Sequence, residues 1–185
     1  MDQNKPKKRY DRKRWLETAL DVLAHKGLAA VRVADLAARL NVTKGSFYHH
    51  FKSREAFLDA LGEYWTQAYT DRVIETIGPP QGDGRERLLT LMHYVAERKL
   101  DRFDMAFRSW AAQDARVARV VERVDERRYH FIRSLFEDAG HTGVELEART
   151  TAWLVFSSAL HSLHFPETGS KDQPSLEDHF RVFMD

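Results

Sequence analysis

Residues 33–51 limit most strongly how this chain can fold, because they read as two short helices joined by a tight turn. Asn41 falls where the first helix must end, a position that favours Gly or Asn because the backbone turns left-handed there. Ala37 is small, so the second helix can cross the first at close range. Helical spacing predicts a set of inward-facing residues, namely Leu36, Ala37, Leu40, Val42, Phe47 and Phe51.

The second of these helices exposes hydrogen-bond donors and no carboxylate. The exposed residues are Lys44, Ser46, Tyr48 and His49. Such a mixture suits a helix that lies in a DNA groove among phosphates and base edges. We expect the Thr43 hydroxyl to cap this helix by accepting an amide of its first turn. For each polar residue, an ordinary solvated surface position is the alternative.

Charge is divided unevenly along the chain. Residues 1–54 carry 13 Lys and Arg against 5 Asp and Glu, whereas residues 55–185 carry 16 against 23. A positive front third predicts a polyanionic partner for that part alone, and a solubility effect is the alternative. We expect residues 1–10 to be a flexible basic arm that contacts phosphate or the minor groove, and a solvated tail without a role is the alternative.

Several classes of function find no support in the composition. The chain has no cysteine, which excludes disulfides, thiolate metal sites and cysteine nucleophiles. No apolar run approaches the roughly 20 residues of a membrane span, and no signal peptide is recognisable, so a cytoplasmic location is expected. His161 and His164 share a helical face without a nearby acidic residue, so we expect no metal and no cofactor. No nucleophile elbow is present, and the chain is not expected to be an enzyme.

Periodicity and turn signals predict an all-α fold. The expected helices cover residues 12–26, 33–40, 44–51, 53–77, 85–100, 105–113, 114–139, 145–163 and 175–184. Ser53 can cap the helix of residues 53–77, a stiff strut of nearly 40 Å at 1.5 Å per residue. The charged face of residues 114–139 reads as solvated surface. The predicted domains are the arm (1–10), a DNA-binding domain (11–70, motif 33–51) and a ligand-binding and dimerisation domain (71–185).

Residues 15–61 resemble the N-terminal domain of TetR/AcrR-family transcriptional regulators. The segments that carry the resemblance are LDVLAHKG (20–27), VADLAARLNVTKGSFYHHF (33–51) and KSREAFLDAL (52–61). It implies a three-helix helix-turn-helix domain followed by a C-terminal helical bundle for regulation and dimerisation. One departure is Arg32, where the family usually has Ser or Thr. A hydroxyl cap is thereby lost, and a guanidinium that could reach phosphate replaces it.

The resemblance also implies roles for residues at the DNA. Thr43, Lys44, Gly45 and Ser46 would lie nearest the base edges, with Tyr48 and His49 at the groove wall and Lys52 at phosphate. Lys44 is the expected base reader, because an ammonium can donate to guanine N7 and O6. Gly45 would let the backbone approach the DNA without an intervening side chain.

Residues 145–163 are apolar or small almost all round, so they lie in the centre of a monomer or are buried by a partner chain as well. With residues 175–184 they could form a four-helix interface in a homodimer, as the last two long helices do in the resembled family. The expected interface residues are Trp153, Phe156, Leu160, Leu163, Phe180 and Phe183.

The C-terminal part also contains aromatic residues with a few polar groups, the usual lining of a small-molecule site. The candidates are Trp65, Tyr69, His93, Phe103, Phe107, Trp110, Phe131 and Trp153. Each of them could be plain core, and the existence of a pocket is implied by the resemblance only. The expected protein is a repressor that binds a pseudo-palindromic double-stranded operator as a homodimer and is released by a small apolar or aromatic effector. The alternative is an architectural DNA-binding protein that needs no effector.

Overall fold

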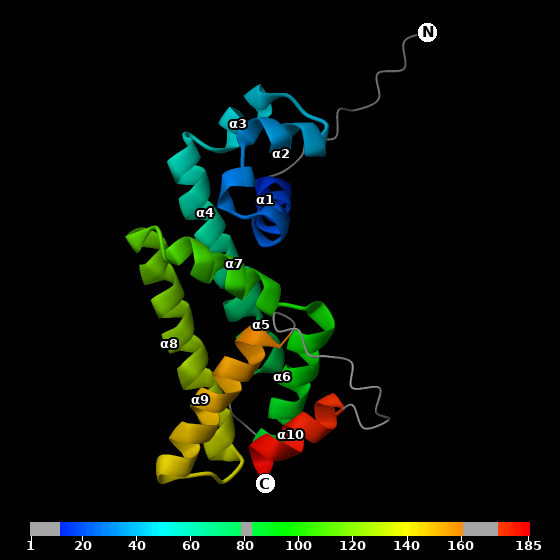
Figure 1. The fold of residues 1–185 in the computed structure, drawn as a ribbon, viewed down its shortest axis with the longest axis vertical. Coiled ribbons are helices and arrows are strands. Elements are labelled where there is room, and N and C mark those ends of the chain that lie inside the picture. The colour runs from blue at the N-terminus through cyan, green and yellow to red at the C-terminus, as the bar shows by residue number, and fades with distance from the viewer. Residues whose placement is uncertain (1–11, 79–82, 161–173) are drawn as a thin grey trace. The chain divides into compact units, whose positions relative to one another are not determined.

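A computed structural model describes residues 12–78, 83–160 and 174–185 (Figure 1). These residues form helices and short connections, which confirms the predicted all-α class. The chain divides into two compact units, Met1–Tyr64 (unit 1) and Trp65–Asp185 (unit 2). The basic arm predicted at residues 1–10 lies outside the described residues. None of the described helices has both the length and the apolar character that crossing a bilayer requires.

Unit 1 contains α1 (Arg12–Lys26), a 3₁₀ turn (Leu28–Ala30), α2 (Val33–Leu40), α3 (Lys44–His50) and most of α4 (Arg54–Thr66). Its core is built around Phe47, which is completely buried. The Phe47 ring lies 5.4 Å from Trp15, 5.2 Å from Phe51 and 5.1 Å from Phe57, measured between centroids. A single side chain of α3 therefore fixes this short helix to α1 and α4.

Local turn signals in unit 1 behave as the sequence predicts. Asn41 adopts the left-handed conformation at φ 55°, and its amide donates to the carbonyls of Ala37 and Ala38. The Ser53 hydroxyl accepts the Ala56 amide at 3.1 Å and so caps the start of α4. Both predictions are confirmed, and they set where α2 ends and where α4 begins.

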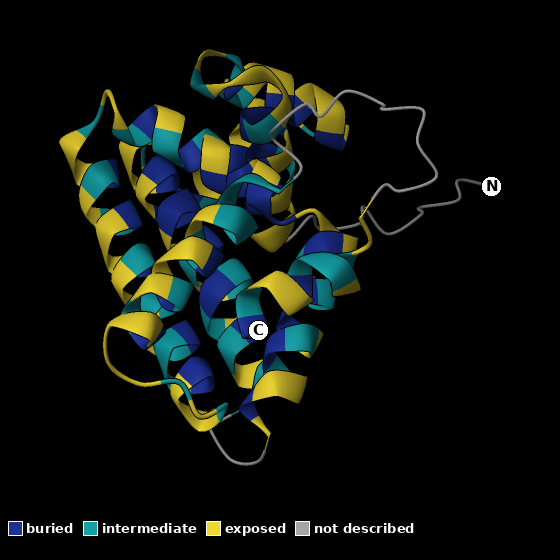
Figure 2. Ribbon diagram, turned by 60° about the horizontal axis from the view of Figure 1, so that its bottom comes forward, coloured by how far each residue is buried: buried dark blue, intermediate teal, exposed yellow. Residues whose placement is uncertain are grey.

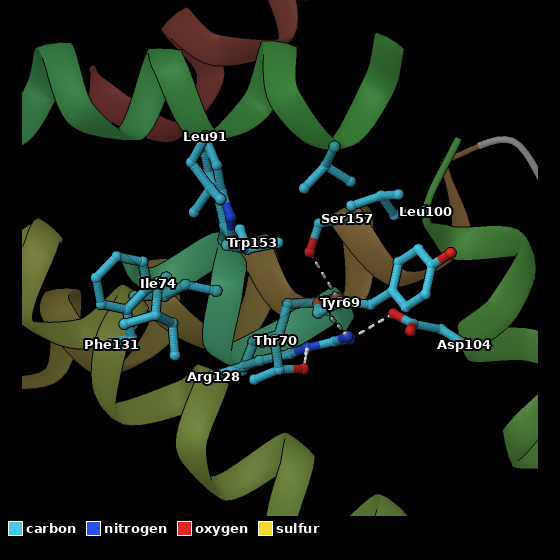
Figure 3. Close-up of a pocket in the computed structure, with 14 residues that line it drawn as sticks. Tyr69, Thr70, Ile74, Leu91, Leu100, Asp104, Arg128, Phe131, Trp153 and Ser157 are labelled. Atoms are coloured by element: carbon cyan, nitrogen blue, oxygen red, sulfur yellow. Dashed lines mark hydrogen bonds and ion pairs between the residues drawn. The ribbon is translucent and has the colours of Figure 1, made fainter. Parts of the chain in front are cut away.

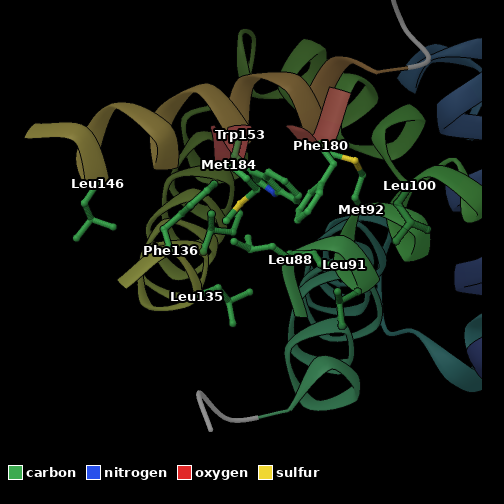
Figure 4. Close-up of a cluster of buried hydrophobic side chains, with 12 residues drawn as sticks. Leu88, Leu91, Met92, Leu100, Leu135, Phe136, Leu146, Trp153, Phe180 and Met184 are labelled. Carbon is green, nitrogen blue, oxygen red and sulfur yellow. The ribbon is translucent and has the colours of Figure 1, made fainter. Parts of the chain in front are cut away.

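Unit 2 contains α5 (Arg72–Ile77), α6 (Gly84–Arg98), α7 (Asp101–Ala111), α8 (Ala115–Asp138), α9 (Gly143–Ala159) and α10 (Leu176–Met184). The long helix α8 contacts α6, α7 and α9. Figure 2 shows the buried residues of these helices on their inner sides and the exposed residues on their outer sides. The core includes Leu88 of α6, Phe136 of α8, Trp153 of α9 and Phe180 of α10 (Figure 4).

The helix predicted over residues 53–77 is helical throughout but changes type in its middle. After α4 ends at Thr66, residues Gln67–Asp71 form a π-helical turn (the π segment), and α5 continues to Ile77. The prediction of an unbroken α-helix is therefore wrong at this point. Arg128, from the distant helix α8, donates hydrogen bonds to the backbone and to a side chain of the π segment. Short-range periodicity in the sequence cannot predict such a contact. Single π turns in α-helices are frequent at functional sites.

The start of α7 is also wrong in the prediction, which placed it near residue 105. The helix begins at Asp101 because α6 ends at Lys99, whose φ of 48° turns the backbone into the left-handed region. A lysine is not a turn signal in the sequence, so this boundary could not be seen there.

Candidate nucleic-acid interface and ligand cavity

The outer face of α3 presents donors to solvent. Lys44, Tyr48 and His49 are exposed and Ser46 is half-buried, while Phe47 occupies the inner face. Tyr48 is 63% exposed, which is high for a large aromatic side chain. Residues 36–54 contain no Asp or Glu, so no carboxylate of this segment competes for these donors. The structure thus brings four of the predicted DNA-binding residues to one accessible surface (the α3 face).

The start of α3 differs from the prediction in one detail. Thr43 occupies the N-cap position, but its side chain accepts no capping hydrogen bond, and the Ser46 amide donates to its backbone carbonyl at 3.0 Å. The predicted hydroxyl cap is therefore wrong, because the backbone oxygen takes the role. Gly45 lies exposed in the first turn, and a Cβ placed on it would meet only the Thr43 Oγ1, at 3.6 Å. Folding therefore does not require a glycine at residue 45.

Other predicted and unpredicted basic residues lie on the neighbouring elements of unit 1. Lys52 is exposed in the turn between α3 and α4. Arg32 is exposed at the N-cap of α2, where its Nε donates to the Ala29 carbonyl at 3.1 Å. Arg12, which the sequence did not single out as a DNA contact, places its guanidinium carbon 5.3 Å from the centre of the Phe51 ring. The sequence hinted at a role for Arg12 only through its position, because a cation in the first turn of a helix is unfavourable to the helix dipole.

Unit 2 contains a cavity lined by the π segment and by α5, α6, α7, α8 and α9, with about 50 Å³ accessible to the centres of water-sized molecules. Three of the predicted pocket residues line it, namely Tyr69, Phe131 and Trp153. Figure 3 shows Thr70, Asp104 and Arg128 grouped on one side of it and the apolar Ile74 and Phe131 on another. The cavity therefore has a polar wall and an apolar wall.

The polar wall is organised by Arg128, which comes from α8. Its Nε donates to the Thr70 hydroxyl at 3.0 Å, its Nη1 to Asp104 Oδ2 at 2.5 Å, and its Nη2 to the Tyr69 carbonyl at 3.1 Å. The side chains are 16% exposed for Arg128 and 7% for Asp104. The guanidinium also lies 5.5 Å from the Trp65 ring centre. Arg128 thus joins α7 and α8 to the π segment, and the reading of the charged face of α8 as solvated surface is wrong at this residue.

The other predicted pocket residues lie elsewhere in unit 2. Trp65 and Phe107 stack at 4.2 Å, Phe103 packs on Tyr69 at 4.7 Å, and Trp110 lies 5.6 Å from Phe107. His93 faces Glu177 of α10 at 3.1 Å. These five residues do not line the cavity. Four of them are core aromatics, and helical spacing alone does not separate core from cavity wall.

The predicted interface residues fall into two groups. Trp153 is 1% exposed and Phe180 5% exposed, so both are core residues that offer no surface to a second chain. Phe156, Leu160 and Phe183 are half-buried, and Leu163 lies outside the described residues. Three other apolar residues are far more open, with exposed fractions of 87% for Val144, 66% for Val155 and 79% for Val182. A shallow groove between α9 and α10 includes Ala148, Ala152, Val182 and Phe183.

A network of polar side chains ties α8 to α9. The Tyr129 hydroxyl donates to Glu147 Oε2, and Arg133 Nε donates to Glu147 Oε1 at 2.9 Å. These hydrogen bonds, the one from Tyr129 first, hold the pKa of Glu147 below its usual value. The same contact raises the pKa of the Tyr129 hydroxyl. The described residues contain no cluster of three or more His, Asp or Glu placed to hold a metal, and His161 and His164 are not among them.

Comparison with known proteins places these features in a family. Residues 16–61 match the family described as "Bacterial regulatory proteins, tetR family". The transcriptional repressor NemR of Escherichia coli is 34% identical over 86 residues, which cover 46% of this chain and 43% of NemR. The match thus spans less than half of that relative's length.

Solved structures extend the likeness to nearly the whole chain. A transcriptional regulator of Rhodococcus sp. RHA1 superposes with a TM-score of 0.67 at 19% identity, covering 95% of this chain and 92% of that one. AibR, solved in complex with isovaleryl coenzyme A and operator DNA, gives a TM-score of 0.67 at 16% identity over 94% of this chain and 95% of AibR. At these identities the likeness shows the shared fold, an N-terminal helix-turn-helix domain followed by a helical domain. Residues 16–61 thus match the tetR family of bacterial regulatory proteins, and the described chain has the two-unit helical fold of solved transcriptional regulators.

Proposed function

We propose that this protein represses transcription by binding a pseudo-palindromic DNA operator as a homodimer, and that a small molecule bound in unit 2 releases it. The α3 face carries the proposal: it is an accessible set of donors without a carboxylate, on a helix whose buried Phe47 packs into the core of unit 1. Phosphate contacts from the basic residues of unit 1 would position the helix, and Lys44 would read a guanine edge. The relative NemR is a transcriptional repressor, and AibR was solved in complex with operator DNA.

A homodimer follows from the size of the reading surface. A single short helix contacts few bases, whereas a two-fold dimer reads two half-sites about one helical turn apart. We assign the interface to α9 and α10, where Val144, Val155 and Val182 are exposed apolar residues in the isolated chain. The groove between these helices, whose lining includes the small residues Ala148 and Ala152, supports close approach of a partner helix. This assignment replaces Trp153 and Phe180 with residues that a partner can reach.

The cavity supports a response to a small molecule. Its wall includes Tyr69 and Thr70 of the π segment, which follows α4 without a break in the chain. Because α4 begins in unit 1, a ligand that shifts the π segment acts on a helix shared by both units. A coupling of about 1–3 kcal/mol would be enough to change operator affinity by about 5–150-fold. Arg128 is the residue through which the cavity and the π segment would communicate.

Selection of bound fragments from a random DNA pool, with purified full-length protein and excess bulk DNA as competitor, tests the DNA-binding part. We expect enrichment of an inverted repeat whose half-sites lie about one helical turn apart. Retention of DNA without any enriched sequence would instead identify an architectural protein. The enriched fragment then serves in a screen for compounds that release it.

A further inference from the structure

One residue on the cavity wall of unit 2 has a buried carboxylate oxygen that accepts no hydrogen bond from the described residues. Asp104 is 5% exposed and lies on the cavity wall. Its Oδ2 accepts the bond from Arg128, but its Oδ1 has no hydrogen-bond partner in the described part of the chain. A buried acceptor of this kind is costly to leave unpaired, and such atoms are rare in folded proteins. We therefore infer that Asp104 Oδ1 accepts a hydrogen bond from a molecule that is not part of the chain.

Arg128 is already committed to the protein itself. Each of its three nitrogens donates to a different group, namely the Thr70 hydroxyl, Asp104 Oδ2 and the Tyr69 carbonyl. Its charge is matched by the one carboxylate with which it pairs. An anionic ligand would thus meet an engaged guanidinium and, beside it, the lone pairs of Asp104 Oδ1. The polar wall favours a neutral or positively charged ligand.

Apart from the Ser157 hydroxyl and Trp153 Nε1, the rest of the lining is apolar, and the space is small. Val73, Leu91, Phe131 and Trp153 border a volume of about 50 Å³ accessible to the centres of water-sized molecules. This exceeds the 10–15 Å³ or so that one water needs, so a compact organic molecule is the natural occupant once side chains adjust. An apolar body against the aromatic rings would also give a cationic head the ring faces it prefers.

We propose that the cavity binds a small neutral or cationic molecule whose hydroxyl or amino group donates a hydrogen bond to Asp104 Oδ1, with its apolar body against Phe131 and Trp153. The inference rests on the proposed role of this cavity as the effector site and narrows the chemistry of the effector. It excludes plain hydrocarbons, which leave Oδ1 unpaired, and carboxylates, which place a second anion against it.

Four compact probes with similar apolar bodies test this, namely cyclopentylammonium, cyclopentanol, methylcyclopentane and cyclobutanecarboxylate. Binding to the full chain is measured by calorimetry and by tryptophan fluorescence, since Trp153 borders the cavity. We expect the first two to bind at least about tenfold more tightly than the last two, the value of a hydrogen bond to a charged group. Equal binding of methylcyclopentane, strongest binding of the carboxylate, or no binding by any of the four would overturn the proposal.

A pair of variants locates the contact. Asp104→Asn keeps the shape of the side chain and removes its charge, so we expect about a tenfold loss of affinity for cyclopentylammonium and a smaller loss for cyclopentanol. Asp125→Asn is the matched control, because Asp125 forms an ion pair between α7 and α8 as well, with Arg108 at 2.6 Å, and does not line the cavity. Unchanged amine affinity in Asp104→Asn, or an equal loss in both variants, would contradict the assignment. Should Asp104→Asn fail to fold, the ranking of the four probes on the natural chain decides alone.

Failure of this inference can be told apart from failure of the proposed function. Sequence-selective DNA binding is measured on the unliganded protein, without any probe. Selective DNA binding together with no preference for the two donors overturns the ligand chemistry and leaves the regulator in place. If cyclopentylammonium and cyclopentanol bind more tightly but DNA binding is unselective, the ligand chemistry is upheld and the proposed operator binding is overturned.

Discussion

At the scale of single residues, two neighbours in α3 have separable roles. Lys44 is exposed, belongs to a segment without carboxylates, and would meet DNA with its ammonium. Gly45 is exposed as well, and its backbone is not in the left-handed region that only glycine adopts readily. Neither residue supports the core, so replacing either by alanine is not expected to unfold the protein.

Replacing Lys44 by Ala should weaken binding to the selected operator and relax the base preference at one position of each half-site. The physical reason is the loss of a donor to a base edge, about 1–3 kcal/mol per half-site. Quantitative binding to the operator and to single-base variants measures it. Lys26→Ala is the control, because Lys26 is also exposed but lies in the last turn of α1. An unchanged base preference in Lys44→Ala would show that Lys44 does not read sequence.

Replacing Gly45 by Ala should leave the stability of the fold unchanged or raise it, while it lowers the affinity for the operator. Alanine is better than glycine inside a helix by about 1 kcal/mol, and the added Cβ meets only the Thr43 Oγ1 at an ordinary contact distance of 3.6 Å. The melting temperature should therefore stay the same or rise, while operator affinity falls because the methyl group separates backbone and DNA. A variant that binds the operator as tightly as the natural chain would remove Gly45 from the interface.

At the scale of elements, the ties between helices explain which boundaries a local pattern misses. Arg128 of α8 donates hydrogen bonds to the π segment. Glu147 of α9 accepts hydrogen bonds from Tyr129 and Arg133 of α8. The first tie shapes a helix that local periodicity describes as continuous. The second tie makes the packing of α8 on α9 sensitive to pH, because the pKa of Glu147 is lowered in the folded chain.

Replacing Glu147 by Gln should lower the stability of the protein at neutral pH but not in acid. The pKa of Glu147 lies below the unfolded value near 4.5, so its ionised form stabilises the fold above that pH, and this contribution disappears as pH falls through the folded pKa. The melting temperatures of the two chains should therefore differ at pH 7 and converge toward pH 3. The difference is small because the Glu147 side chain is 46% exposed. If the two melting temperatures differed as much at low pH as at pH 7, the effect of the substitution would come from packing and not from the charge of Glu147.

At the scale of the whole molecule, the proposed function needs two reading helices. The described surface of α9 and α10 carries the exposed apolar residues Val144, Val155 and Val182, which a partner chain would cover. In the proposed dimer, each unit 2 joins to its copy and thereby presents two α3 faces to one DNA duplex.

Replacing Val155 by Glu should convert the dimer to a monomer and reduce operator affinity by more than tenfold, while leaving each chain folded. Val155 is 66% exposed within one chain, so a carboxylate is tolerated there until a second chain buries it. Sedimentation measures the mass, and circular dichroism measures the fold. Met105→Glu, at an exposed apolar residue of α7, is the matched control and should remain dimeric. A Val155→Glu protein that stays dimeric would place the interface elsewhere.

The sequence by itself determined what depends on neighbours along the chain. Apolar spacing predicts α1, α2 and α3 within a residue of their bounds, Asn41 marks the left-handed turn, and the missing carboxylates mark the α3 face. These features are readable because helix faces, caps and turns depend on residues a few positions apart.

Only the tertiary structure decided what depends on residues far apart in sequence. Arg128 and Thr70 are 58 positions apart, yet their contact accompanies the π segment and forms the polar wall of the cavity. Burial likewise separated Trp153 and Phe180, which are core, from Val155 and Val182, which are exposed. A helical pattern states which residues share a face, but what that face meets is fixed only when the helices pack, since burial is a property of the assembled core.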